Sequence, residues 1–517
     1  MGDQEKEIRR LEYLAQSNPR LWKWRVGFWV ALGYGVLALF PLSLLTLIGT
    51  TMLWAWSQGC LCVQAANPAV LLGVLALFSA LGLALSAFVV RLSPPPGIPL
   101  RSADAPELFA EIRNLSKQLH MRPFTRVLLT PDGGAGVVEL PRAWGGTVSY
   151  LLIGLPLLET LSMEQFRAVL THELGHLRGG DSRFTRATVR LSAIWERLYG
   201  RGGGRAFRKF AGWYFPRLAA HTYAVRRNHE RLADRLAAHV CGKEALADAL
   251  GAALGRLQFL DEAFQAALEQ HARAVPHPPE KLFTAYLTTL SAPLSDAEKK
   301  QALRAAMGEA SAPTDPHPSL IERMEALGCS ARIPARSDIS AAQALLGPSR
   351  IRLTETMDAL WRKQLTPDWR RTFTETRAAR RERTLLEEKL ARGEWLDGAT
   401  LLRLAGYVEL FDGPDAARPY FERLRMHPEA GARAIFALGR QDLEAGRPDG
   451  LWRMENVLQR VPEQAAEGLQ LLYRFHRNRG DWRAAADVLR RQQSWQSAPL
   501  ARPEPQERFD KEACMIR

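Results

Sequence analysis

Cysteine is scarce in this sequence of 517 residues, which contains only five. They are Cys60, Cys62, Cys241, Cys329 and Cys514, and no framework of cysteine pairs runs through the C-terminal part. Secreted domains that depend on disulfides are richer in cysteine, so the bulk of the chain is expected in a reducing compartment. Cys60 and Cys62 could form a strained disulfide, although two ordinary thiols are the simpler interpretation.

Charged side chains are absent from two long segments near the N-terminus. Residues 26–56 and 69–90 contain no Asp, Glu, Lys or Arg, although charged residues make up 24% of the sequence. About 20 apolar residues cross a bilayer, so these segments predict a transmembrane hairpin at 26–91, with spans at about 28–50 and 69–90. The alternatives are two buried core helices, which seldom lack charge over such lengths, and a signal peptide, whose apolar region is shorter.

Basic residues are distributed unevenly around these segments. Residues 1–25 contain six (Lys6, Arg9, Arg10, Arg20, Lys23 and Arg25), residues 57–67 contain none, and Arg91 and Arg101 follow the second segment. Positive charge favours the cytoplasmic side, so residues 1–25 and everything after the hairpin are expected to be cytoplasmic. The sequence thus predicts a multi-pass protein of the cell inner (cytoplasmic) membrane, in contact with membrane lipid.

Recognisable patterns of nucleic-acid-binding domains are also absent. The sequence contains no RNP, helix-turn-helix or zinc-finger pattern, although its formal net charge is +14. Positive charge alone fits an anionic membrane as well as a nucleic acid. Because two candidate membrane segments are present, lipid is favoured and no nucleic-acid partner is expected.

From residue 100 the composition becomes that of a globular domain. A helical pattern at 103–119 precedes short strand-like runs at 125–130, 137–140 and 150–153, which predict a small sheet beside helices. Next comes Ser162-Met163-Glu164-Gln165, which has the form of a capping box and predicts the start of a helix.

That helix carries the sequence His172-Glu173-Leu174-Gly175-His176. The two histidines are four positions apart, so they share a helix face and both imidazoles can reach one Zn²⁺. Glu173 between them can accept a proton from an attacking water. The pattern also occurs by chance as a solvated or buried pair of histidines, so a third ligand is needed to support a metal site.

Residues 227–234 provide a candidate for this third ligand. Glu230 and Asp234 share a face of the predicted helix, and Asp234 could accept the free ring N–H of one histidine and fix its tautomer. His229 is a rival ligand, but it projects about 100° away from Glu230 around the helix. Glu230 is therefore preferred.

Three motifs in this order make the sequence resemble the HtpX-like and CAAX-prenyl-protease-type membrane zinc metallopeptidases. They are His172-Glu173-x-x-His176 with Asp181, Arg227-x-x-Glu230-x-x-Ala233-Asp234, and His317-Pro318-x-x-x-x-Arg323. The resemblance covers roughly residues 100–330 and implies one Zn²⁺ per chain. It implies that His172, His176 and Glu230 bind the zinc, that Glu173 is the general base, that His317 stabilises the oxyanion, and that Asp234, Asp181 and Arg323 support the ligands.

The sequence departs from this family in several places. The asparagine-containing edge strand is replaced by a glycine-rich segment, so residues 134–140 are a candidate edge strand for substrate or an ordinary hairpin. Arginines throughout residues 178–227 exclude the further membrane helices of HtpX-type members, and residues 205–217 are interpreted as an interfacial segment or a mixed core-and-surface helix.

Two membrane spans cannot enclose an active site in a membrane chamber as prenyl proteases do, which disfavours prenylated substrates. His277-Pro278 is a decoy for the third motif, because Phe283 stands where arginine is expected.

Beyond residue 335 the sequence is helical in pattern. A connector is expected at 336–395, and self-comparison at an offset of 34 then aligns positions within 396–498, among them Leu404, Leu438 and Leu472. The period resembles tetratricopeptide repeats, whose stacked helix pairs form a groove for protein partners. A plain helical bundle is the alternative. Residues 499–517 are expected to be a tail with Cys514 as a free thiol.

The predicted fold is mainly α with a small β-sheet. It comprises the transmembrane hairpin, a zincin-type (gluzincin) metallopeptidase domain at 100–335 and a C-terminal α-helical repeat region. We expect a zinc metalloendopeptidase that hydrolyses protein or peptide substrates near the cytoplasmic membrane face, in membrane-protein quality control. One alternative is a catalytically silent membrane scaffold that binds partners through the repeats. Another is an exopeptidase, although the 54 positions from His176 to Glu230 exceed the spacing in thermolysin-type and aminopeptidase gluzincins.

Overall fold

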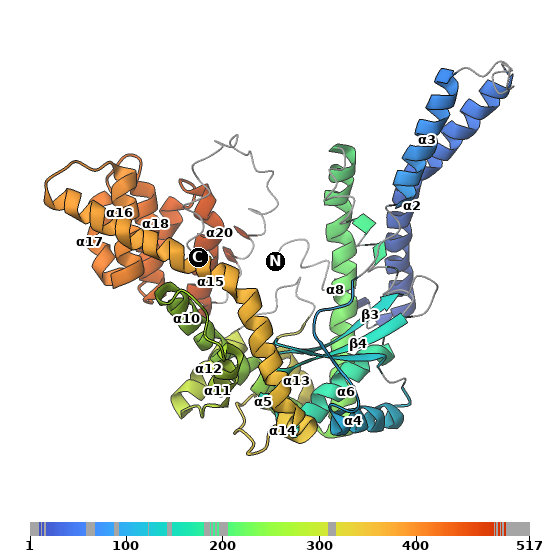
Figure 1. Cartoon of the computed structure of the whole chain (residues 1–517), viewed down its shortest axis with the longest axis horizontal. Coiled ribbons are helices and arrows are strands. Elements are labelled where there is room, and N and C mark those ends of the chain that lie inside the picture. Colours follow the sequence, from blue (N-terminus) through green and yellow to red (C-terminus); the bar gives the residue numbers. More distant parts are fainter. Residues whose placement is uncertain are drawn as a thin grey trace. The chain divides into compact units, whose positions relative to one another are not determined.

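The chain forms mostly helices and one small sheet (Figure 1). The computed structural model describes residues 17–57, 68–86, 93–121, 124–141, 147–179, 205–308 and 317–479, with a few positions at 10–14, 187–195 and 481–492. Two compact units are present: an N-terminal unit of residues 3–272 and 277–367, and a C-terminal unit of residues 1–2, 273–276 and 368–517.

Two apolar helices lie near the N-terminus. They are α2, Pro19–Ser57, and α3, Pro68–Ser86, which contact each other. Among the described residues, one helix, Arg20–Ser57, is long and apolar enough to cross a membrane, whereas the apolar stretch of α3 is shorter, at Leu72–Leu83. The structure thus supports the first member of the predicted hairpin. Part of the second predicted span, residues 87–90, lies outside the described residues.

The sheet has the strand order β1-β2-β4-β3. Its strands are β1, Ile98–Leu100; β2, Arg126–Thr130; β3, Ala135–Pro141; and β4, Thr147–Gly154. β2 and β4 are parallel, and the other two pairs are antiparallel. β3 is therefore an edge strand, at the place predicted for residues 134–140. The expected sheet beside helices is confirmed.

The main apolar core of the N-terminal unit includes residues of the sheet and of the helices packed on it. These helices are α4, Pro106–Gln118; α5, Leu155–Thr160; α6, Met163–Gly179; and α11, Leu282–Ser291. The predicted capping box begins α6, since the Ser162 N–H donates to Gln165 Oε1 at 2.9 Å and the Gln165 N–H to Ser162 Oγ at 3.2 Å. A fixed helix start sets the positions of His172 and His176, about three and four turns further on.

The remaining elements of the N-terminal unit follow α6 in the chain. They are α8, Arg205–Cys241; α9, Lys243–Leu250; the π-helix η1, Gly251–Leu257; α10, Gln258–Ala274; α12, Asp296–Gly308; α13, Leu320–Leu327; and α14, Ala341–Leu346. The last helix, α15, Ser349–Ala391, begins in this unit and continues into the C-terminal unit. α14 and the start of α15 contribute Leu345, Leu353 and Met357 to the main core. The buried carboxylate of Glu159 on α5 holds them, because Ser340 Oγ donates to it at 3.1 Å and Arg350 pairs with it.

The C-terminal unit consists of consecutive helices packed on one another. They are α16, Gly398–Asp412; α17, Pro414–Leu424; α18, Gly431–Glu444; α19, Asp449–Val457; the short 3-10 helix η2, Pro462–Gln464; and α20, Ala465–Asn478. Leu404, Leu438 and Leu472, which the offset of 34 aligns, are all buried. This common burial fits repeated helix pairs, and a plain bundle of helices would bury its leucines as well.

One buried charge in the C-terminal unit predicts sensitivity to acid. Asp442 is 1% exposed and accepts hydrogen bonds from Arg418 at 2.9 Å and Arg447 at 2.8 Å, and Arg453 also pairs with it. Burial alone would raise the pKa of Asp442, but these arginines lower it below its usual value. A depressed pKa stabilises the folded state above the unfolded pKa of about 3.9, and this stabilisation is lost as the pH falls through the folded pKa.

We therefore expect Asp442→Asn to lower the free energy of unfolding of this unit by about 1.5–3 kcal/mol at pH 7. The difference from the unchanged protein should shrink as the pH falls below about 4, where the carboxylate becomes protonated. Denaturant unfolding followed at pH 7 and pH 3 measures both effects. Asp449→Asn, at an exposed position on α19, is the matched control. A constant difference at both pH values would contradict the role of the charge.

Candidate metal centre

The candidate centre lies where α6 and α8 pack side by side (Figure 1). Their close approach depends on small residues. A Cβ added at Gly175 would lie 2.9 Å from Ala233 Cα, and Ala233 itself is fully buried. The small side chain of Ala233 therefore lets α8 approach α6 closely. Glutamate has a short side chain, so this contact is what brings Glu230 within reach of the histidines.

Three potential ligands converge across this contact. His172 Nε2 and His176 Nε2 are 3.1 Å apart, and each lies 3.4 Å from an oxygen of Glu230. Atoms that bind one tetrahedral Zn²⁺ at 2.0–2.2 Å are roughly 3.3–3.6 Å from each other, so the observed spacing is close to that of a zinc site. The geometry brings together the three residues predicted as ligands.

The donor set also fits a cation in its chemistry. Glu230 is 4% exposed, and its Oε2 is buried and makes no hydrogen bond to any described residue. A buried carboxylate oxygen without a hydrogen bond is costly unless a cation satisfies it. Two imidazoles and one carboxylate are the protein ligands of many catalytic zinc sites, which leave a further position for water or substrate.

Asp234 and Arg323 support the site from behind His172. Asp234 Oδ1 lies 2.9 Å from His172 Nδ1. Arg323 holds the same carboxylate with two hydrogen bonds, from Nε at 2.9 Å and from Nη2 at 2.5 Å. At this distance Asp234 can accept a proton from Nδ1 of His172, which would leave Nε2 for a metal. Asp234 lies one turn beyond Glu230 on α8, and the structure places Arg323 of α13 against it.

Glu173 and His317 both lie next to the ligand cluster. Glu173 is 8% exposed, and its carboxylate belongs to a group with His172 and His176 whose potential ligand atoms all lie within 4.8 Å of one another. His317 Nδ1 lies 3.1 Å from Glu230 Oε1, and its side chain is 67% exposed. A buried carboxyl and an accessible imidazole thus lie next to the same ligands.

Other residues considered from the sequence have different positions. Asp181 lies outside the described residues. His277 is exposed before α11, and no described contact links it to the cluster. His229 is partly buried, and no hydrogen bond or ion pair among the described residues joins its ring to the cluster.

One positioning contact was not predicted from the sequence. Arg227, which is buried on α8, lies 3.5 Å from Glu322 at the start of α13. Glu322 is in turn part of the capping box with Ser319, two residues after His317. The pattern Ser319-x-x-Glu322 was a signal for this helix start, but many acidic residues could have paired with Arg227.

The charges of the site shift the pKa values of its residues in opposite directions. Burial lowers the pKa of His172, but the neighbouring carboxylates of Asp234 and Glu230 outweigh burial and raise it to about 9. Burial and the charge of His172 lower the pKa of His176 to about 4. Burial raises the pKa of Glu173. Burial would also raise the pKa of Glu230, but the histidines that face Glu230 outweigh this effect and hold the pKa of Glu230 well below its usual range. The cluster is thus built to hold positive charge between carboxylates.

Comparison with known proteins agrees with this geometry. Residues 144–330 match the sequence model of Peptidase family M48, and this segment contains all the converging residues. The match supports a metallopeptidase function for the N-terminal unit. No curated protein and no solved structure matches the chain.

Proposed function

We propose that the chain is a membrane-anchored zinc metalloendopeptidase of HtpX-like type. The observation that carries the proposal is the convergence of two imidazole nitrogens and one carboxylate from α6 and α8, at 3.1–3.4 Å, inside the segment that matches Peptidase family M48. Zn²⁺ bound by His172, His176 and Glu230 would supply a Lewis acid that polarises water and the scissile carbonyl.

The residues of the chain have distinct roles in this proposal. Glu173 accepts the proton of the attacking water and returns it to the leaving amine, and its raised pKa suits a group that does both. Asp234 keeps the proton of His172 on Nδ1, and Arg323 keeps Asp234 in place. His317 is accessible at the site and donates a hydrogen bond to the developing oxyanion.

The edge strand β3 is the proposed docking place for substrate. Its outer edge carries backbone groups that a substrate strand can pair with, and this mode of binding recognises the main chain with little demand on side chains. Gly134 and Gly136 have no neighbour within 4 Å of an added Cβ, so the backbone can be approached closely there. Such a site suits unfolded proteins and peptides of varied sequence.

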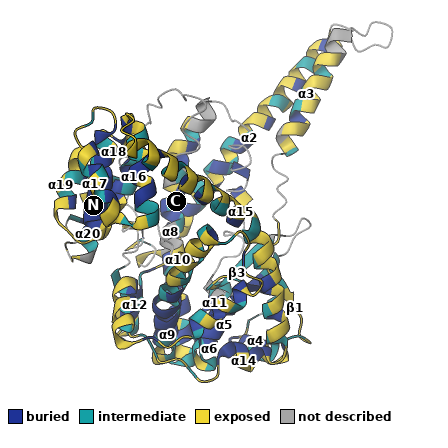
Figure 2. Cartoon of the chain, turned by 60° about the vertical axis from the view of Figure 1, so that its left-hand side comes forward, coloured by how far each residue is buried: buried dark blue, intermediate teal, exposed yellow. Residues whose placement is uncertain are grey.

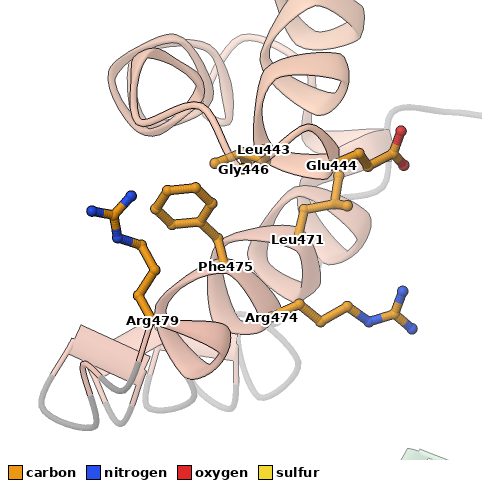
Figure 3. A pocket seen from close by; sticks show the side chains of 7 residues that line it. All are labelled: Leu443, Glu444, Gly446, Leu471, Arg474, Phe475 and Arg479. Carbon is orange, nitrogen blue, oxygen red and sulfur yellow. The ribbon is translucent and has the colours of Figure 1, made fainter. Parts of the chain in front are cut away.

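The rest of the chain would bring this site to its substrates. We propose that α2 and α3 form a hairpin in the cell inner membrane, with both units cytoplasmic, and that the enzyme removes damaged membrane proteins. The helices of the C-terminal unit are proposed as tetratricopeptide-like repeats that bind protein partners. A small cavity of about 210 Å³ lies there. Figure 3 shows Phe475, Arg474 and Arg479 among the side chains that line it.

Removal of the metal provides the direct test. We expect the full chain, purified in detergent, to cleave unfolded casein, to lose this activity on treatment with a chelator and to regain it with one equivalent of Zn²⁺ per chain. Zinc should also raise the thermal midpoint, because a ligand present at 1,000 times its Kd stabilises the folded state by about 4 kcal/mol.

His176→Ala and His229→Ala form a matched pair for this test. His176→Ala should abolish zinc binding and the thermal shift, whereas His229→Ala, beside Glu230 but outside the cluster, should retain both. Equal cleavage with and without metal would refute the proposal. Zinc binding without any cleavage would favour the catalytically silent scaffold, and release of single terminal residues would favour an exopeptidase.

A further inference from the structure

The apolar helix α2 has two parts with different surroundings. The part up to Leu37 packs against the N-terminal unit, since Val30 and Leu37 are buried together with Trp195 and Tyr214. Beyond Leu37, large apolar side chains are exposed, including Leu39 at 64% and Phe40 at 61%. Figure 2 shows exposed positions along α3 and the outer part of α2.

The first part of α2 is fixed to α8 by specific contacts. The hydroxyl of Tyr214 donates to the carbonyl oxygen of Trp29 at 2.7 Å, and the ring of Trp29 lies 5.8 Å from that of His221. A Cβ added at Gly33 would lie 2.2 Å from the Tyr214 hydroxyl. Trp29 thus contacts both Tyr214 and the later His221, whereas Gly33, one turn further along α2, lies against Tyr214. The two helices therefore run antiparallel, with α8 leading from the middle of α2 down to the metal ligands.

Exposed basic side chains lie beside this packed part. Arg190 is exposed and acts electrostatically on Tyr34 of α2. Lys209 and Arg217 on α8 are also exposed, and the Arg217 guanidinium lies 4.8 Å from the centre of the Trp213 ring. Hydrocarbon does not readily surround exposed arginine and lysine, whereas anionic headgroups attract them. The packed part of α2 therefore belongs to the polar side of a membrane boundary.

The exposed part of α2 has the length of a bilayer core. Residues 38–57 span about 30 Å at 1.5 Å per residue, which equals the usual hydrocarbon thickness. α3 has 19 residues and spans about 28 Å beside it. The hydrocarbon boundary therefore falls just after Leu37, about ten residues later than the sequence alone predicted from the start of the uncharged segment.

We propose that α8, docked on the first part of α2, acts as a spacer that holds the metal centre about 30 Å from the hydrocarbon of an anionic phospholipid bilayer. From Gly33 to Leu37 α2 rises about 6 Å, and from Tyr214 to Glu230 α8 extends about 24 Å in the opposite direction. An extended chain covers at most about 3.3–3.6 Å per residue. The enzyme accordingly cleaves a membrane protein only where at least about eight residues separate the bond from the end of a span. This specificity rests on the proposed function.

The boundary can be tested without catalysis. We expect Phe28→Cys to react with a water-soluble maleimide, and Phe40→Cys to be protected, when the full chain is reconstituted in vesicles of phosphatidylethanolamine and phosphatidylglycerol. The two side chains are equally exposed in the protein, at 62% and 61%, so only the bilayer distinguishes them. Mass spectrometry of the labelled peptide quantifies each site despite the native cysteines. Protection of both, or labelling of both, overturns the proposed boundary.

The spacing is tested with a series of tethered substrates. Each has a transmembrane helix, a flexible tether of 3, 6, 9, 12 or 20 residues, and a casein segment that the enzyme cleaves in solution. We expect at least tenfold slower cleavage at 3 and 6 residues than at 12 and 20. Equal cleavage at all tether lengths overturns the role of α8 as a spacer. Failure to cleave even the free casein segment overturns the proposed function. In that case the maleimide labelling alone decides where the hydrocarbon boundary lies.

Two glycines of α2 supply matched variants for this series. Gly33→Ala should disturb the contact with Tyr214, whereas at Gly35 an added Cβ meets nothing within 4 Å. We expect Gly33→Ala to cleave the free casein segment at the normal rate and to accept the short tethers, and Gly35→Ala to behave as the unchanged protein. Labelling should show that α2 is displaced from α8 in Gly33→Ala. If the cleavage rate of this variant still depended on tether length as in the unchanged protein, the role of α8 as a spacer would be contradicted.

Discussion

Glu173→Gln is expected to lower kcat for protein cleavage by about 10²–10⁴-fold while the chain still folds and binds one zinc. Glutamine has nearly the same size as glutamate, so the buried space beside His172 and His176 stays filled. The amide, however, cannot accept a proton from water. Steady-state cleavage of casein and zinc analysis of the purified variant measure the two halves of this prediction.

Glu164→Gln is the matched control for this variant. Glu164 is on the same helix, α6, but is exposed in its first turn, so its replacement should leave kcat within a factor of two or so of normal. The inactive Glu173→Gln chain should also retain substrates, and membrane proteins bound to it can be identified after isolation from cells. If Glu173→Gln cleaved casein at near the normal rate, the assignment of the general base would be wrong.

Arg323→Ala is expected to cause the largest loss of stability. Arg323 and Asp234 are both nearly buried, with side chains 10% and 7% exposed. Removal of the guanidinium leaves a buried carboxylate without its partner, which costs about 3–5 kcal/mol. The freed Asp234 also holds His172 less firmly, so the affinity for zinc should fall by about 10–100-fold. Denaturant unfolding of the metal-free chain and zinc titration measure these effects separately.

The chain contains a matched arginine for comparison. Arg332 binds Asp248 with two hydrogen bonds of 2.6 and 2.7 Å, a geometry similar to that of Arg323, but its side chain is 66% exposed. Arg332→Ala should therefore cost far less stability than Arg323→Ala and leave zinc binding unchanged. Arg323→Lys should fall between the alanine variant and the unchanged protein, because an ammonium cannot replace the bidentate contact. Equal losses for Arg323→Ala and Arg332→Ala would show that burial does not govern this pair.

The site was largely predictable from the sequence because its information is local. Helical periodicity places His172 and His176 on one face, and the same rule places Glu230 and Asp234 on one face of the second helix. The close approach of the two helices depends on Gly175 and Ala233, which lie far apart in the sequence. Arg323 was expected only by resemblance, since nothing local in its own segment points to a partner that lies 89 positions away.

The surroundings of α8 were less predictable because they depend on distant packing. Aromatic and basic residues alternate at 205–217, a pattern that fits an interfacial segment and a packed helix equally well. In the structure Phe210, Tyr214 and Phe215 pack in a cluster with α2, whereas Trp213 is 45% exposed. The partner, Trp29, lies about 185 positions earlier and had been interpreted only as part of a membrane span.

The helix α15 has a consequence for how the chain can be divided. Its first turns supply Leu353 and Met357 to the main core of the N-terminal unit, and Leu386 near its end belongs to a core of the C-terminal unit. A chain truncated at residue 335, where the motifs end, would lack α14 and the partners of Glu159, and would expose apolar surface that the intact protein buries. The metallopeptidase is thus not a separable module at that point. The division between the two units falls further on, after Pro367 within α15.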